Sequence, residues 1–181
     1  MKERLTIFGV GFIVSCVGIM FFLHFRKLRS GESGIIKGMI NAAGEVGNIE
    51  EWIEADTFVV KLPRETVTVH LNAVDTPPLG MPGGNESLQF LKDLVGQDPV
   101  RVLEFRRTDQ GDIVGEVYTQ ANLSLNEELM KAGWAWFYEP DSTRNPYYQE
   151  LNDAAIKERK GLWSLGEPVP PWKTIPRNTA P

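Results

Sequence analysis

Two apolar, β-branched runs, each with an aspartate at its edge, place the strongest constraint on the fold of this chain. Asp56 opens the run that continues through Thr57–Val60, and Asp75 closes a second run further along. Between them, the alternation of Thr66–Leu71 predicts the returning strand of a β-hairpin. If the strands are neighbours, both carboxylates can converge on one hard cation, which prefers oxygen ligands. By itself, Asp75-Thr76-Pro77 is also typical of a strand that turns into a loop.

Short strand patterns outnumber helix patterns in the rest of the chain. We expect strands at residues 35–40, 50–62, 66–71, 100–105 and 113–118. We expect helices at 86–95, from a Ser124–Glu127 capping box to Gly133, and from Pro146 to about Lys160. The proline-rich tail from Glu167 is expected to be extended, with Trp172 as its anchor. This order favours a small, mostly antiparallel β-barrel with packed helices over a doubly wound α/β fold.

Residues 5–25 form an apolar segment that contains no Asp, Glu, Lys or Arg. As a helix they would rise about 31 Å, which matches the roughly 30 Å hydrocarbon core of a bilayer. The segment is longer than the core of a signal peptide, and no small-x-small cleavage site follows it. We therefore expect an uncleaved, single-pass membrane anchor rather than a cleaved signal peptide. Basic residues lie on both sides of the segment, so the side of the membrane stays open.

These patterns divide the chain into five parts. They are an N-terminal tail at 1–4, a transmembrane helix at 5–25, a basic, flexible linker at 26–34, a globular domain at 35–166 and a proline-rich tail at 167–181. Beyond Gly34 the chain carries 14 basic and 22 acidic side chains, a net charge of −8. An acidic surface repels phosphates, so strong binding of nucleic acid is disfavoured and a protein partner is expected besides the membrane. Solubility alone would also explain this charge.

Six short motifs follow one another along the chain. They are Asp56–Val60, Val74–Pro77, Glu86–Lys92, Gly111–Tyr118, Leu125–Trp136 and Lys160–Ser164. In this order and spacing they resemble the staphylococcal nuclease (thermonuclease-like) family, over about Glu50 to Trp172. The resemblance implies a five-stranded OB-fold barrel with accessory α-helices, in agreement with the barrel expected from the pattern. It also implies a calcium-dependent nuclease that hydrolyses phosphodiester bonds of DNA or RNA.

The family holds its calcium ion with two aspartates and a backbone carbonyl. The resemblance places Asp56, Asp75 and Thr76 at these positions, and such an all-oxygen set suits calcium. The turn before the first aspartate has drifted, because Ala55 replaces the usual glycine and Glu54 precedes it. We therefore expect a weak calcium site and no other cofactor.

The family's catalytic positions are all replaced in this chain. A glutamate that activates water in the family is Pro78 here, and two arginines that stabilise charge on the phosphate are His70 and Asp112. Proline has no side-chain base, and an aspartate adds negative charge where negative charge develops. Histidine cannot make the bidentate contact of a guanidinium. No catalytic residue is therefore expected at the family's positions.

Other charged residues could have taken over these roles. The available side chains are Glu86, Arg64, Arg106 and Arg107. Glu86 has a simpler role at the N-terminus of a predicted helix, where its charge is favourable to the helix dipole. Arg106 and Arg107 lie between a strand and a turn, where we expect solvated side chains.

An aromatic cluster follows the stop of the second long helix. Its members are Trp134, Trp136, Phe137 and Tyr138, with Tyr147 and Tyr148 further along. Such rings can stack on bases, as on other OB-folds, but their spacing favours packing within the protein. His70 lacks a Cys or His companion, so no zinc site is predicted.

Two hypotheses about function remain. The first is a membrane-anchored nuclease-like domain with a degenerate active site, which binds or scaffolds and has little or no hydrolytic activity. The second is a divergent calcium-dependent endonuclease at the membrane. The residues at positions 70, 78 and 112 favour the first.

Overall fold

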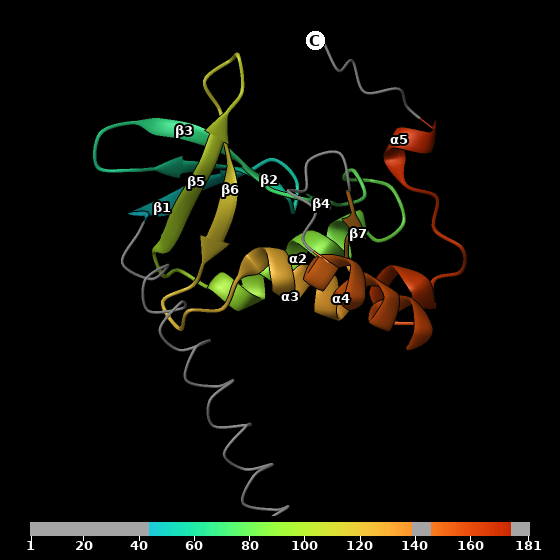
Figure 1. The fold of residues 1–181 in the computed structure, drawn as a ribbon. Helices are drawn as coiled ribbons and strands as arrows, with labels where there is room; N and C mark the ends of the chain where they lie inside the picture. Colours follow the sequence, from blue (N-terminus) through green and yellow to red (C-terminus); the bar gives the residue numbers. More distant parts are fainter. Residues whose placement is uncertain (1–43, 139–145, 175–181) are drawn as a thin grey trace, which may run out of the picture. The chain divides into compact units, whose positions relative to one another are not determined.

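Five strands close into a barrel in the computed structural model of this chain, which describes residues 44–138 and 146–174 (Figure 1). The strands are β1 Glu45–Trp52, β2 Thr57–Lys61, β3 Thr66–Leu71, β5 Val100–Arg107 and β6 Ile113–Tyr118, in the order β1-β2-β3-β6-β5. Antiparallel pairing of β1 with β5 closes the barrel, whereas β3 and β6 run parallel. The barrel with accessory helices that the sequence predicts is confirmed.

Alternating apolar side chains fill the barrel interior. Phe58 and Val60 on β2 and Val67 and Val69 on β3 are all buried, while their strand neighbours face outward to varying degrees. Successive side chains of a strand point to opposite faces, so every second residue can enter the core. The alternation of side chains along Thr66–Leu71 therefore corresponds to residues that point into the barrel and residues that point out of it.

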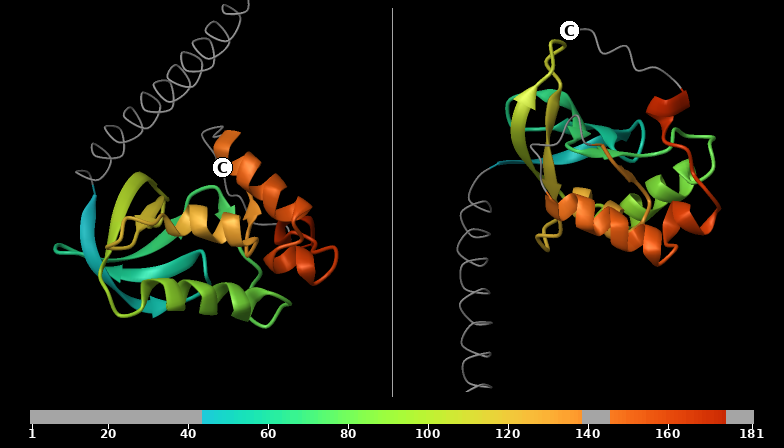
Figure 2. Two further views of the ribbon diagram at one scale, coloured as in Figure 1. Left: turned by 90° about the horizontal axis from the view of Figure 1, so that it is seen from below. Right: turned by 45° about the vertical axis from the view of Figure 1, so that its right-hand side comes forward.

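Three helices pack together beside the barrel, as both views of Figure 2 show. They are α2 Gly84–Val95, α3 Leu125–Ala132 and α4 Pro146–Lys157. Glycines end α2 and α3 as expected, at Gly96 and Gly133. One half of the predicted capping box forms: the Ser124 hydroxyl accepts a hydrogen bond from the Glu127 amide at 3.3 Å, while the Glu127 carboxylate pairs with Lys131 instead.

The single strand predicted at 50–62 is wrong, because the chain turns between β1 and β2. The amides of Ile53 and Glu54 both donate to the Thr57 carbonyl, which reverses the chain within a few residues. β1 begins at Glu45, inside a stretch whose glycines and asparagine predicted loop. Pairing with both β2 and β5 outweighs the low strand propensity of these residues. The strand predicted at 35–40 lies outside the described residues.

The helices that the structure describes contradict the membrane location expected from the sequence. In the parts of the chain that the structure describes, no helix is both long and apolar enough to cross a bilayer. The helices α2 and α4 have 12 residues each, about 18 Å of rise against a hydrocarbon core of roughly 30 Å. Residues 5–25, on which the prediction of an anchor rested, lie outside the described residues.

The tail from Glu167, which was expected to be extended, contains one short helix, and a 3₁₀ turn lies just before the tail. A 3₁₀ turn, η2, spans Gly161–Ser164, and a short helix, α5, spans Pro171–Thr174. The Trp172 ring contacts the rings of Trp136 and Tyr138, with centroid distances of 6.2 and 5.0 Å. Trp172 is thus the anchor that the sequence predicts, and these aromatic rings pack on one another within the protein.

A left-handed residue bends the chain between β3 and the next strand, β4 Val74–Asp75. Ala73 is buried and has a φ of 61°, a conformation that costs a non-glycine residue roughly 1–2 kcal/mol. The carbonyls on both sides are held: Asn126 Nδ2 donates to the Asn72 carbonyl at 3.0 Å, and the Tyr138 amide donates to the Ala73 carbonyl at 3.0 Å. The surrounding structure therefore determines this bend and the direction of the residues that follow.

Two further interactions fix the same region. β4 pairs antiparallel with β7, Trp136–Phe137, which places Asp75 opposite Trp136. The fully buried Asn126 side chain also accepts from the Val117 amide at 3.2 Å, so it joins α3, β6 and the bend. Buried polar groups are costly unless they are hydrogen-bonded, and here the side chain is used as both donor and acceptor.

A half-buried carboxylate on β6 ties α4 to the barrel. Glu116 accepts hydrogen bonds from the hydroxyls of Tyr118, Ser124 and Tyr148 at 2.7, 2.9 and 2.7 Å. Burial, followed by the nearby Glu116 charge and hydrogen bond, raises the pKa of the Tyr148 phenol well above its usual value. The phenol therefore stays a donor over the whole neutral range.

Replacing Asn126 by alanine should destabilise the protein by about 2–3 kcal/mol, because it strands the Asn72 carbonyl and the Val117 amide in the interior. Urea unfolding followed by circular dichroism measures this change. Asn152→Ala is the control, since Asn152 makes one long 3.4 Å contact to the Phe137 amide and should cost less than half as much. Equal costs for the two variants would contradict the special role of Asn126.

Tyr148→Phe should lower the free energy of unfolding by about 1–2 kcal/mol, whereas Tyr147→Phe, on the exposed neighbour, should change it by less than about 0.5 kcal/mol. Because the folded-state pKa of Tyr148 is raised, its contribution is complete below the unfolded-state value of about 10 and is lost as the pH rises further. Wild-type stability should therefore fall more steeply above about pH 10 than that of Tyr148→Phe. Parallel pH profiles would contradict this assignment.

Candidate functional site

The turn after β1 and the strand β4 bring the two aspartate motifs together. The Leu71 amide donates to the Asp56 backbone carbonyl at 2.8 Å, and the Thr76 amide donates to Asp56 Oδ2 at 2.6 Å. Asp56, Asp75 and Thr76 are 6%, 1% and 1% exposed. The Asp56 carboxylate is therefore in contact with the residue that follows Asp75, and both carboxylates lie in a buried setting.

A chain of polar contacts leads from Asp56 through Thr57 to His70 and Asp112. The Thr57 hydroxyl donates to Asp56 Oδ1 at 2.9 Å and lies 3.2 Å from His70 Nδ1. On the other side of the ring, His70 Nε2 lies 3.3 Å from Asp112 Oδ2. Because a carboxylate only accepts, all three contacts are satisfied together when both ring nitrogens carry hydrogen and donate.

This arrangement occupies both nitrogens of His70 with protein partners. The imidazole and the Asp112 carboxylate are 37% and 31% exposed, so the pair lies at the surface of the site. A histidine that ligates a metal or accepts a proton needs a nitrogen with a free lone pair. His70 must therefore break a contact with Thr57 or Asp112 before it can take either role.

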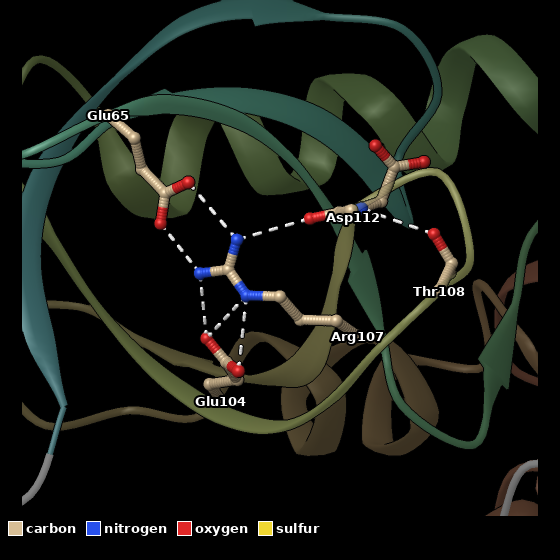
Figure 3. A network of polar contacts seen from close by, with 6 residues as sticks. Glu65, Glu104, Arg107, Thr108 and Asp112 are labelled. Carbon is tan, nitrogen blue, oxygen red and sulfur yellow. Dashed lines mark hydrogen bonds and ion pairs between the residues drawn. The ribbon is translucent and has the colours of Figure 1, made fainter.

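The hairpin turn between β5 and β6 holds Asp112 in place. The Asp112 amide donates to Thr108 Oγ1 at 3.1 Å, and the Thr108 amide donates to the Asp112 carbonyl at 2.9 Å. Figure 3 shows the Asp112 carboxylate directed away from the guanidinium of Arg107. The turn thus presents the carboxylate toward β3, where His70 lies, rather than toward the nearest arginine.

Arg107 is the relocation candidate nearest to this turn, and acidic neighbours hold it. Its guanidinium pairs with Glu65 at 2.6 Å and with Glu104 at 3.0 Å, and it donates to the Gly111 carbonyl at 3.2 Å (Figure 3). The hydrogen bond from Arg107 lowers the pKa of the Glu65 carboxyl, and Glu65 in turn raises the pKa of Arg107. A phosphate would have to compete with two carboxylates for this side chain.

The other relocation candidates are exposed at the surface. Arg64 and Arg106 are exposed, on the β2–β3 turn and on β5. Glu86 is exposed in the first turn of α2, where it matches the predicted interaction with the helix dipole. Pro78 lies in the loop between β4 and α2, where its carbonyl accepts from the Met81 amide at 3.0 Å. Its side chain offers no base.

The donor set of the converging segments can be compared with what a calcium ion requires. Asp56, Asp75 and the Thr76 carbonyl supply only oxygen, and the buried Thr76 hydroxyl has no hydrogen-bond partner within the described residues. Calcium takes six to eight oxygen ligands, so water would have to complete the set. No group of three or more His, Cys, Asp or Glu side chains suited to a metal occurs among the described residues. The residues fit calcium in chemistry and fall short in number.

Sequence reasoning missed two residues of this region. Thr57 connects Asp56 to His70, and its place next to the first aspartate is the signal that could have identified it. Asn126 orients the bend before Asp75 from a helix far along the chain. Nothing in the sequence distinguishes it from Asn85 and Asn152, which also lie in described helices, so only the three-dimensional structure identifies it.

Comparisons with known proteins agree with this geometry. The family model described as staphylococcal nuclease homologue matches residues 68–165. An Escherichia coli protein named uncharacterized endonuclease is 34% identical over 126 residues, which cover 70% of this chain and 82% of the relative. A Shigella flexneri micrococcal nuclease is 30% identical over 143 residues, covering 70% and 78%, and the rice probable staphylococcal-like nuclease CAN3 is 32% identical over 104 residues, covering 58% and 27%.

The family match includes the second part of β3, the strands and helices that follow it, and the 3₁₀ turn η2. The family match begins within β3, two residues before His70, and ends just after η2. It therefore spans His70, Asp75, Pro78 and Asp112. On these matches and this fold, the chain belongs to the staphylococcal nuclease family.

Proposed function

We propose that this protein is a nuclease-fold module that has lost efficient phosphodiester hydrolysis and acts by binding. One observation carries the proposal: His70 and Asp112, at the family's two arginine positions, contact each other at 3.3 Å. Where the family has two guanidinium groups, this chain has an imidazole in contact with a carboxylate. Such a pair leaves little positive charge to stabilise a phosphate.

The energetic consequence for catalysis is large. Phosphoryl transfer depends on positioning and on preorganised charge around the phosphate, and loss of one such donor costs about 10²–10³ in rate. Both cations are absent from their family positions here, and Arg107 is engaged by Glu65 and Glu104. Pro78 removes the side-chain base as well. The missing base and the missing cations would all have stabilised the same transition state. The rate of phosphodiester hydrolysis that remains should therefore be very low.

A divergent calcium-dependent endonuclease is the second candidate. The observation in its favour is that Asp56, Asp75 and Thr76 are retained and lie together. If calcium is bound, these residues would hold it, and the ion would supply positive charge that polarises a phosphodiester. Thr57 and the Asn126-supported bend would then orient the two aspartate segments.

The purified full-length protein should cleave single-stranded DNA and RNA no faster than the Asp56→Ala variant, with millimolar calcium and from neutral to alkaline pH. The reason is that Pro78, His70 and Asp112 stand where the family has its base and its two guanidinium groups. Gel analysis of end-labelled oligonucleotides measures the rate. Robust cleavage by the wild-type protein that stops with chelator and with Asp56→Ala would overturn the proposal and favour the second candidate.

The triple variant His70→Arg, Pro78→Glu, Asp112→Arg tests whether these positions explain the loss. It should gain measurable calcium-dependent cleavage, while each single change should gain little, since the groups act as a unit. The matched control is His70→Gln, Pro78→Gln, Asp112→Gln, which disrupts the same contacts without adding the charges. Equal activity of both triple variants would show that the restored charges are not the cause.

Calcium should bind weakly, with a dissociation constant of roughly 10⁻⁴–10⁻³ M, because only three protein oxygens are expected to ligate it. Isothermal titration calorimetry on the full-length protein measures the affinity. Asp75→Asn should abolish binding, whereas Asp109→Asn, on an exposed turn of the same barrel, should leave it within about twofold. A micromolar affinity that is lost with Asp75→Asn would mean that the site is stronger than its donor count indicates.

A further inference from the structure

We propose that the apolar pocket beside Pro78 binds a lysine side chain of a partner protein, which deepens and rests on the proposed binding function. The pocket has a volume of about 280 Å³ and lies between the β4–α2 loop and the C-terminal segment. It is lined by Pro77, Pro78, Met81, Pro82, Trp136, Leu162, Leu165, Glu167, Pro168 and Val169. The position that is a catalytic glutamate in the family thus forms part of a binding wall here.

The walls of this pocket are poor in hydrogen-bond donors. Four of its lining residues are prolines, which have no backbone N–H. The Trp136 indole N–H is buried and has no hydrogen-bond partner among the described residues. The carboxylate of Glu167 is an acceptor at the edge of this lining, and it favours an occupant that carries a donor.

Glu167 gives the pocket its only charged side chain. Glu167 is exposed, so its carboxylate can contact a cation at the rim of the pocket and remain hydrated. The chain beyond Gly34 has a net charge of −8, which attracts basic partners at long range. A lysine has a four-carbon stem for the apolar walls and an ammonium group for the rim, which matches this combination.

Exposed apolar side chains gather around the same opening. Met81, Leu165 and Val169 line the pocket and are 42%, 56% and 55% exposed, and Leu79 in the same loop is 44% exposed. Contiguous apolar surface of this kind marks an interaction site more often than scattered single residues do. The surface beside the pocket can therefore contact apolar residues that flank the lysine.

The pocket is held in shape before any partner binds. Gly83, with a φ of 89°, follows the loop, and a Cβ at this position would collide with the buried Leu162 of η2. Trp172 packs on Trp136 and Tyr138, which fixes the chain just beyond Val169. A preformed wall on each side reduces the ordering cost of binding.

The test uses the full-length protein and the peptide acetyl-Ala-Leu-Lys-Leu-Ala-amide, with norleucine in place of lysine in a second peptide. Titration followed by NMR should shift the Trp136 indole signal, assigned with Trp136→Phe, and the lysine peptide should bind more tightly than the norleucine peptide. Glu167→Gln should weaken the lysine peptide about two- to fivefold and leave the norleucine peptide unchanged. Glu86→Gln, an exposed acid outside the pocket lining, is the matched control and should change neither affinity.

Leu165→Asn checks the apolar wall without relying on charge, and it should weaken both peptides to a similar extent. Equal binding of the two peptides, or no effect of Glu167→Gln, would overturn the assignment of lysine as the occupant. Failure of either peptide to move the Trp136 signal would overturn the pocket as a peptide site. The cleavage assay described above does not depend on peptide binding. The protein can therefore lack hydrolytic activity, as proposed, even if the peptide titration contradicts a lysine pocket.

Discussion

The left-handed bend at Ala73 is the constraint on which the arrangement of the site depends. Without it, β3 would continue straight and Asp75 would not return toward Asp56. A single alanine cannot hold this conformation by its own preference, so the Asn126 side chain and the Tyr138 amide hold the carbonyls on either side. Three elements distant in sequence therefore cooperate to place one aspartate. The geometry of the site is a property of the whole barrel and its helices rather than of the motif.

Under the proposed function, the pair His70 and Asp112 removes positive charge from a phosphate site while the barrel is kept. Removing one arginine alone would leave the other cation in place. Here, one position has become a donor and the other an acceptor, and the two meet across the β3–β6 seam. The contact is compatible with a stable barrel, so the loss of positive charge need not destabilise the protein. The neighbouring carboxylates Glu65 and Glu104 hold Arg107 in a similar way.

Much of the fold could be predicted from local patterns, since the period-two alternation of Thr66–Leu71 and the glycine stop of α2 are local properties of the chain. The places of Asp56 and Asp75 at strand edges could likewise be predicted, since Asp56 directly precedes β2 and Asp75 ends β4. The boundary between β1 and β2 was missed because the apolar residues Trp52 and Ile53 continue across the turn. The His70–Asp112 contact and the role of Asn126 depend on strands and helices that meet only in three dimensions. No local pattern encodes them.

The parallel pairing of β3 with β6 also has a consequence for how the barrel assembles. The β2–β3 and β5–β6 hairpins each join neighbours in sequence, whereas Val69 must meet Ile113 across a segment that contains α2. Closing such a long loop costs entropy before its contacts are gained, so the two hairpins should form early and this seam late. Interactions formed after the transition state slow unfolding rather than speed folding. The contact between His70 and Asp112 at the seam would thus act mainly on the lifetime of the folded barrel.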